Sequence, residues 1–99
     1  MQKVVVISGS SRGLGRALAA SFGRAGYRLL VNGRDPLTLE IARHELARAG
    51  FQVLGVVADV STREGAQRVV KQAMARFGQI DVLVNNAGAL GPGGQPPLE

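Results

Sequence analysis

Four short apolar runs divide the chain, and the stretches between them carry apolar residues at the spacing of amphipathic helices. The runs cover residues 3–7, 28–32, 52–57 and 81–85. Runs of this length, rich in valine and leucine, are typical of strands that are buried on both faces. Buried strands that alternate with amphipathic helices predict an α/β fold, in which helices cover both faces of a parallel sheet.

The first predicted helix follows the run at residues 3–7. It ends before Gly26, which stands where a glycine is expected just beyond a helix. Its less polar residues recur at the spacing of one helix face. The buried face predicted from this spacing consists of Leu14, Ala17, Leu18, Ser21, Phe22 and Ala25.

Residues that favour helix starts introduce the other two predicted helices. Asp35 and Pro36 combine a carboxylate that can cap a helix with a proline suited to its first position. Ser61 and Glu64 have the spacing of a capping box. The predicted buried faces are Leu39, Ala42, Leu46 and Ala49 in the second helix, and Ala66, Val69, Val70, Ala73, Met74 and Phe77 in the third.

The alternation also predicts how the strands are ordered. Right-handed connections in a doubly wound parallel sheet give the strand order 3-2-1-4, in which the winding reverses between the first and fourth strands. Ligands bind at this reversal, beyond the carboxyl ends of the strands. We therefore expect one domain over residues 1–89, with functional residues just after these two strands, and a Gly/Pro-rich tail over residues 90–99.

Composition excludes several classes of function. The 99 residues include no cysteine and one histidine, His44, so neither a disulfide framework nor a metal site is expected. The net charge of +5 attracts anions in general, but the arginines are scattered rather than clustered, which argues against nucleic-acid binding. The uninterrupted apolar stretch at residues 4–7 is far too short to span a membrane, and the start of the chain lacks the pattern of a signal peptide. A cytoplasmic protein is expected.

A glycine-rich loop follows the first predicted strand. A pyrophosphate needs backbone N–H groups at a helix N-terminus and no Cβ atoms in its way. Gly9 permits a sharp turn, Gly15 lets the helix lie close to the sheet, and the hydroxyls of Ser10 and Ser11 are candidate phosphate donors. A plain strand–turn–helix connection is the alternative, but the position between a buried strand and a helix favours phosphate binding. The loop reads Ser8-Gly9-Ser10-Ser11-Arg12-Gly13-Leu14-Gly15.

The glycine spacing is similar to the T-G-x-x-x-G-x-G motif of short-chain dehydrogenases/reductases, with Ser8 in place of the usual threonine. Asp59-Val60 resembles the family's Asp-hydrophobic pair, which holds the adenine ring. Asn85-Asn86-Ala87-Gly88 is similar to its N-N-A-G motif, which lies along the cofactor. Taken singly, Asp59 is also explained as a helix-entry carboxylate, and the two asparagines as turn formers.

The resemblance covers nearly the whole chain. It implies a Rossmann-like fold that binds a nicotinamide dinucleotide, as in the NADP-dependent members that resemble 3-oxoacyl carrier-protein reductases. The cofactor-binding residues that it implies are Gly9, Ser10, Ser11, Arg12, Gly13, Leu14, Gly15, Arg34, Asp59, Val60, Asn85, Ala87 and Gly88.

Charge at the end of the second predicted strand favours NADP over NAD. NAD-binding members place an acid there, and it accepts hydrogen bonds from the ribose hydroxyls. Here the strand ends with Asn32-Gly33-Arg34, and no acid precedes Asp35. Arg12 and Arg34 can instead grip a 2′-phosphate. Two alternatives stay open: Asp35 turns back toward the ribose, or both arginines are ordinary surface residues.

The catalytic set that the resemblance implies is missing from these residues. The family uses a serine and a Tyr-x-x-x-Lys pair, in which the tyrosine acts as general acid or base. The single tyrosine, Tyr27, is followed four residues later by Val31, and Lys3 and Lys71 lie outside any such pair. The chain is expected to be the inactive, cofactor-binding portion of an oxidoreductase that interconverts an alcohol and a carbonyl. A stand-alone nucleotide-binding or sensor module and an engineered half-fold are the alternatives.

The fourth predicted strand suggests self-association. In the resembled fold this strand is internal, whereas in these residues nothing is predicted to pair with its outer edge. Val82, Leu83 and Val84 are then expected to line an open apolar edge, which is a template for pairing with another chain. A homo-oligomer is expected, formed most simply through this edge or else by exchange of an element between two chains.

Overall fold

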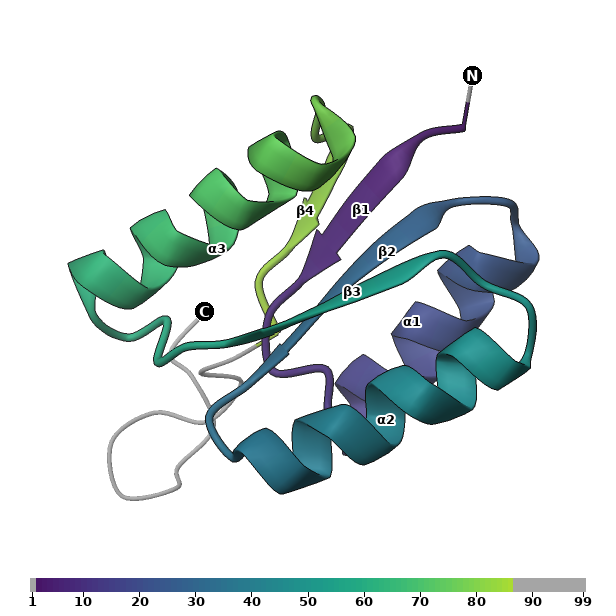
Figure 1. Ribbon diagram of the computed structural model, residues 1–99, viewed down its shortest axis with the longest axis horizontal. Coiled ribbons are helices and arrows are strands. Elements are labelled where there is room, and N and C mark those ends of the chain that lie inside the picture. Colours follow the sequence, from purple (N-terminus) through teal and green to yellow (C-terminus); the bar gives the residue numbers. More distant parts are fainter. Residues whose placement is uncertain (1, 87–99) are drawn as a thin grey trace.

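The computed structural model describes residues 2–86 and contains a four-stranded parallel sheet (Figure 1). Its strands lie in the order β3-β2-β1-β4, which confirms the predicted order 3-2-1-4. The predicted tail at residues 90–99 lies outside the described residues. The strands are β1 (Val4–Ile7), β2 (Arg28–Gly33), β3 (Val53–Val57) and β4 (Val82–Val84).

Three helices connect the strands and cover both faces of the sheet. Figure 1 shows α1 and α2 on one side and α3 on the other. This arrangement follows from the right-handed connections of a doubly wound sheet. The helices are α1 (Gly13–Arg24), α2 (Pro36–Arg48) and α3 (Arg63–Phe77).

The strands carry one core on each face because successive side chains of a strand point to opposite sides. Val5, Ile7 and Leu29 pack toward α1 and α2. Val6 and Leu30 pack toward α3. All five are fully buried, and burying each such side chain contributes about 1.5–3 kcal/mol relative to leaving it exposed. The sheet is therefore a rigid platform for whatever follows its strand ends.

The buried face of α1 differs from the predicted one. Small residues, Gly15, Ala19 and Gly23, face the sheet, whereas Leu14 is 68% exposed. Small side chains let the helix lie close to β1 and β2. The size of the side chains, and not their hydrophobicity, therefore decides which face of α1 is buried. The other members of the predicted face are not fully buried. Leu18 and Phe22 are half-buried against the core, and Ala17, Ser21 and Ala25 are exposed.

The faces of the other two helices are largely those predicted, but narrower. Leu39, Ala42 and Leu46 are buried in α2, and Val69 and Ala73 are buried in α3. The remaining predicted positions are not fully buried, because only part of the apolar face of each helix contacts the sheet. These positions are Ala49, Ala66, Val70 and Met74, which are exposed, and Phe77, which is half-buried.

The start of α2 is as predicted, and the start of α3 is not. Asp35 accepts hydrogen bonds from the amides of Leu37 and Thr38, both at 3.4 Å. The capping box predicted at Ser61 and Glu64 is wrong, because the helix begins one residue later than it requires.

The residue that caps α3 is Thr62. Its Oγ1 accepts from the amide of Gly65 at 2.9 Å. Ser61 is drawn away from the helix by Asp59, whose Oδ1 accepts from the Ser61 amide at 3.0 Å and from its hydroxyl at 2.6 Å. A competing local turn around Asp59 therefore displaces the predicted capping box.

The edge strand β4 exposes fewer apolar side chains to solvent than predicted. Val82 and Val84 pack against the core on the α1 face, so only Leu83 of the three predicted residues is exposed, at 63%. Among the described residues, β4 pairs with β1 alone. None of the helices in residues 2–86 is long and apolar enough to cross a membrane.

Candidate functional site

A cleft of about 1030 Å³ lies at the carboxyl ends of the strands. The loops after all four strands contribute to it, which is where a doubly wound sheet binds its ligands. Seven of the predicted site residues line this cleft: Gly9, Ser11, Arg12, Arg34, Asp59, Val60 and Asn85. The residues of its lining that were not in the predicted set are Asn32, Gly33, Asp35, Thr38, Ala58, Ser61 and Asn86.

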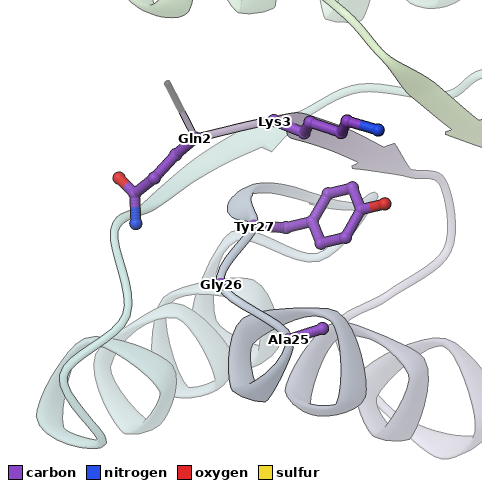
Figure 2. A pocket seen from close by; sticks show the side chains of 5 residues that line it. All are labelled: Gln2, Lys3, Ala25, Gly26 and Tyr27. Carbon is purple, nitrogen blue, oxygen red and sulfur yellow. The ribbon is translucent and has the colours of Figure 1, made fainter.

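A second hollow, of about 600 Å³, lies at the opposite end of the sheet and is shown in Figure 2. Gln2, Lys3 and Tyr27 supply its polar groups, and the Tyr27 ring lies between the start of the first strand and the end of α1. Tyr27 packs edge-on against Phe22, with ring centroids 4.9 Å apart. None of the predicted site residues lies here, and we assign the functional site to the larger cleft.

Two asparagines hold the turn that leaves β1. Gly9 has a φ of +59°, which turns the chain sharply out of the sheet. The Gly9 amide donates to Asn32 Oδ1 at 3.1 Å, and the Gly9 carbonyl accepts from Asn86 Nδ2 at 2.9 Å. A Cβ on Gly15 would overlap that carbonyl oxygen and lie 2.7 Å from Asn86 Nδ2, so only glycine fits there.

Ser10 has a different role from the predicted one. Its side chain is fully buried beneath the loop, and its hydroxyl donates to the carbonyl of Ile7 at 2.6 Å. A hydroxyl has one proton, so Ser10 has none left for a phosphate oxygen. The prediction of Ser10 as a hydroxyl donor to phosphate is therefore wrong for this arrangement. The Ser10 hydroxyl instead fastens the loop to the sheet.

The start of α1 lacks a side-chain cap, unlike the starts of α2 and α3. Arg12 occupies the N-cap position, and its side chain accepts no hydrogen bond from the helix. The first amides of a helix have no carbonyl partner within it, and an anion is a suitable partner for them. These amides belong to Gly13, Leu14 and Gly15, none of which lines the cleft itself.

Two arginines line the cleft beside Asp35, whose carboxylate accepts hydrogen bonds from the start of α2. Arg12 and Arg34 both line the cleft, and neither forms an ion pair within residues 2–86. Hydrogen bonds from the Thr38 hydroxyl and from the amides of Leu37 and Thr38, together with the charge of Arg12, lower the pKa of Asp35. Asp35 is thus ionised and directed into the start of α2.

Asp59 lies on the other side of the cleft, at the end of β3. Hydrogen bonds from the hydroxyl and amide of Ser61 lower the pKa of Asp59, and the charge of Arg34 lowers it further. Both Ser61 bonds go to the same carboxylate oxygen, Oδ1. The turn around Asp59 thereby fixes a carboxylate at the cleft wall, next to Val60.

The last strand contributes Asn85 and Asn86. Asn85 Oδ1 accepts from the Ser8 hydroxyl at 3.2 Å, which joins the end of β4 to the end of β1. The predicted site residues Ala87 and Gly88 lie outside the described residues. Among the described residues, no group of three His, Cys, Asp or Glu side chains is arranged to hold a metal ion.

The sequence model of the family described as short chain dehydrogenase matches residues 3–98. The chain belongs to the short-chain dehydrogenase family.

Curated members of the short-chain dehydrogenase family match almost the whole of this chain. It is 41% identical over 101 residues to 1-deoxy-11-beta-hydroxypentalenate dehydrogenase from Streptomyces exfoliatus, which covers 98% of this chain. The match covers only 37% of that enzyme, so the chain spans little more than a third of its length.

Solved structures of short-chain dehydrogenases superimpose well on the described fold. L-sorbose reductase from Gluconobacter frateurii, complexed with NADPH and L-sorbose, has a TM-score of 0.85 and 42% identity over 88% of this chain and 34% of its own. Actinorhodin polyketide ketoreductase with NADPH has a TM-score of 0.86 and 33% identity over 91% of this chain and 34% of its own.

Proposed function

We propose that the cleft binds NADP(H). The observation that carries this proposal is the charge pattern around it: Arg12 and Arg34 are available at the wall, whereas Asp35 is directed into the start of α2. A carboxylate turned toward the ribose would repel a 2′-phosphate, whereas the hydrogen bonds of Asp35 hold its carboxylate toward the first amides of α2. Arginine can bind a phosphate through two parallel hydrogen bonds.

Each part of the dinucleotide has residues suited to it. The uncapped start of α1 would hold the pyrophosphate, because its amides lack partners and the helix dipole favours negative charge. Arg12 and Arg34 would hold the 2′-phosphate, and Asp59 and Val60 would border the adenine. Two similar reductases bind NADPH in their solved structures, which supports the same cofactor here.

We further propose that the chain supplies the cofactor-binding part of an oxidoreductase that interconverts an alcohol and a carbonyl. The cofactor would supply or accept the hydride, and the residues of this chain would bind and orient it. Tyr27 lies at the opposite end of the sheet from the cleft and packs on Phe22, so it is unsuited to proton transfer in the cleft. The 99 residues alone are expected to be inactive.

Calorimetric titration of the purified chain tests the cofactor assignment. NADPH is expected to bind more tightly than NADH, and added salt is expected to narrow the difference because the contact is ionic. Equal affinities at low and high salt would contradict the assignment to NADP(H). Tight binding of NADH alone would favour NAD.

A separate assay tests the proposed inactivity of the chain. NADPH mixed with the chain and a panel of carbonyl compounds is expected to show no oxidation above background. Turnover that is lost on substituting Tyr27 would show that the chemistry lies within these residues. A Tyr-x-x-x-Lys sequence further along the reading frame would favour the oxidoreductase over a stand-alone binding module.

We also propose that the chain forms homo-oligomers through β4. Within residues 2–86 this strand has a single neighbour, and Leu83 exposes most of its side chain beside the unpaired edge. Val70 and Met74 of α3 are 44% and 47% exposed on the same side of the sheet. An exposed strand edge with apolar side chains beside it favours pairing with a second copy.

A further inference from the structure

Asn32 is a polar side chain at the end of a buried strand, and its contacts cross the floor of the cleft. It is only 1% exposed. Its Oδ1 accepts from the Gly9 amide at 3.1 Å. Its Nδ2 donates to the carbonyls of Val56 and Ala58, at 3.0 Å and 3.1 Å. Both protons of this amide group are therefore used.

These contacts join the two halves of the cleft through backbone atoms. Gly9 begins the glycine loop on one side, and Ala58 immediately precedes Asp59 on the other. Since all three partners are backbone groups, their spacing does not depend on the rotamers of surface side chains. Asn32 thus fixes the distance between the loop and the turn around Asp59.

We propose that Asn32 is a positioning residue for dinucleotide binding, which it serves by holding the phosphate side and the adenine side of the cleft at one spacing. The inference rests on the proposed function. A ligand that spans both sides requires that spacing, whereas a ligand that contacts one side does not. Buried polar groups that lose a partner are costly, so the bridge is hard to break without a change in the cleft.

The difference between spanning and one-sided ligands supplies the test. NADPH spans the cleft, whereas inorganic pyrophosphate contacts only the phosphate side, at the start of α1. In Asn32→Ala and Asn32→Asp, NADPH affinity is expected to fall at least about tenfold, and affinity for inorganic pyrophosphate to stay within about threefold. The aspartate variant keeps an acceptor for Gly9 and removes both donors, so it isolates the link to Val56 and Ala58. Its added negative charge acts on both ligands, since both are anions.

A control variant separates positioning from general loss of stability. Val4→Ala removes buried volume at the start of β1, at the end of the sheet opposite the cleft. It is expected to lower the melting temperature and to leave both affinities unchanged. Equal losses for the two ligands in the Asn32 variants, or no loss for either, would overturn the positioning role. No NADPH binding by the wild-type chain would instead overturn the proposed function.

Hydrogen exchange on the wild-type chain tests the same inference without any substitution. If Asn32 holds the loop in place beforehand, the Gly9 amide is protected before any ligand is added. Fast exchange at Gly9 that slows only when NADPH is present would overturn the proposal, even where the Asn32 variants fail to fold.

Discussion

Ser10 and Asn32 are joined by two hydrogen bonds that extend the ladder between β1 and β2 past the end of β1. The Ser10 amide donates to the Asn32 carbonyl at 2.7 Å, and the Asn32 amide donates to Ser10 Oγ at 2.8 Å. A side-chain hydroxyl thus takes the place of a backbone carbonyl. The chain leaves the sheet at Gly9 and returns to it one residue later, which holds the loop against the sheet.

Ser10→Ala is expected to destabilise the fold. The substitution leaves the buried Asn32 amide and the Ile7 carbonyl without the hydroxyl, and an unsatisfied buried group costs about 1–3 kcal/mol. Urea unfolding measures the change in the free energy of unfolding. Ser21→Ala, at an exposed position of α1, is the control and should change stability by less than about 0.5 kcal/mol. An equally small effect of Ser10→Ala would show that its bonds contribute little.

Arg34→Asp is expected to reverse the cofactor preference. Losing a charge-assisted bond to the 2′-phosphate costs about 1.5–3 kcal/mol, which corresponds to roughly ten- to hundredfold weaker NADPH binding. The new carboxylate can also accept from the ribose hydroxyls of NADH. Calorimetry measures both affinities. Arg48→Asp makes the same charge change at the far end of α2, and a comparable effect from it would point to net charge alone.

Gly15→Ala is expected to damage both folding and cofactor binding. The added Cβ would collide with backbone at Gly9, and relief requires α1 to move away from the loop. Such overpacking typically costs about 1–3 kcal/mol. Gly55→Ala is the matched control, because its Cβ would lie 3.4 Å from the flexible Arg43 side chain. Thermal unfolding and NADPH titration of the two variants should differ sharply, and similar results would contradict the close approach at Gly15.

Asp81 is expected to contribute to stability above about pH 4 and to lose this contribution in acid. Hydrogen bonds from the Val4 amide and the Gln79 side chain, together with the charges of Lys3 and Arg28, lower the pKa of Asp81 below 3.8. A group with a lowered pKa in the folded state stabilises the fold above its unfolded pKa, and this stabilisation is lost as pH falls through the folded pKa.

Urea unfolding from pH 6 to pH 2 tests this expectation with Asp81→Ala. The difference in unfolding free energy between the wild type and the variant should shrink as the pH falls below about 4. Glu64→Gln removes an exposed carboxylate from α3 and serves as the control. A difference that stays constant over the whole range would mean that ionisation of Asp81 is irrelevant to stability.

Leu83→Lys is expected to shift the chain toward the monomer. Lysine beside a strand edge opposes pairing with another chain, and Leu83 is exposed, so the substitution leaves the core intact. Val84 packs against the core and is a poorer choice. Light scattering at high micromolar concentration measures the mass. Leu37→Lys, at a site 70% exposed on α2, is the control, and a wild-type chain that is already monomeric would refute association through β4.

The sequence predicted the arrangement of the elements better than the faces of its helices. Four apolar runs and the rule of right-handed connections were enough for the strand order. Apolar periodicity predicted the wrong buried face for α1. Gly15, Ala19 and Gly23 face the sheet because they are small, and a hydrophobicity pattern carries no information about side-chain size. The capping box failed at Ser61 because a turn around Asp59 competes for the same side chain.

The motifs predicted seven residues that line the cleft, whereas Asn32 and the structural role of Ser10 were missed. Arg12, Arg34 and Asp59 could be found because their types match the chemistry of a dinucleotide. Asn32 and Ser10 act on backbone groups that are distant in sequence, and such contacts have no local pattern. One signal was present: Asn32 directly follows the apolar residues Leu29, Leu30 and Val31, and a buried amide there requires several partners.

Gly65 illustrates how far such constraints extend from the cleft. It lies in the first turn of α3 and does not line the cleft, yet a Cβ there would overlap the carbonyl group of Asp59. Any side chain at this position would displace the wall that carries Asp59. In a library of variants selected for cofactor binding, position 65 would then be as intolerant as the arginines, although inspection of the cleft alone would mark it as neutral.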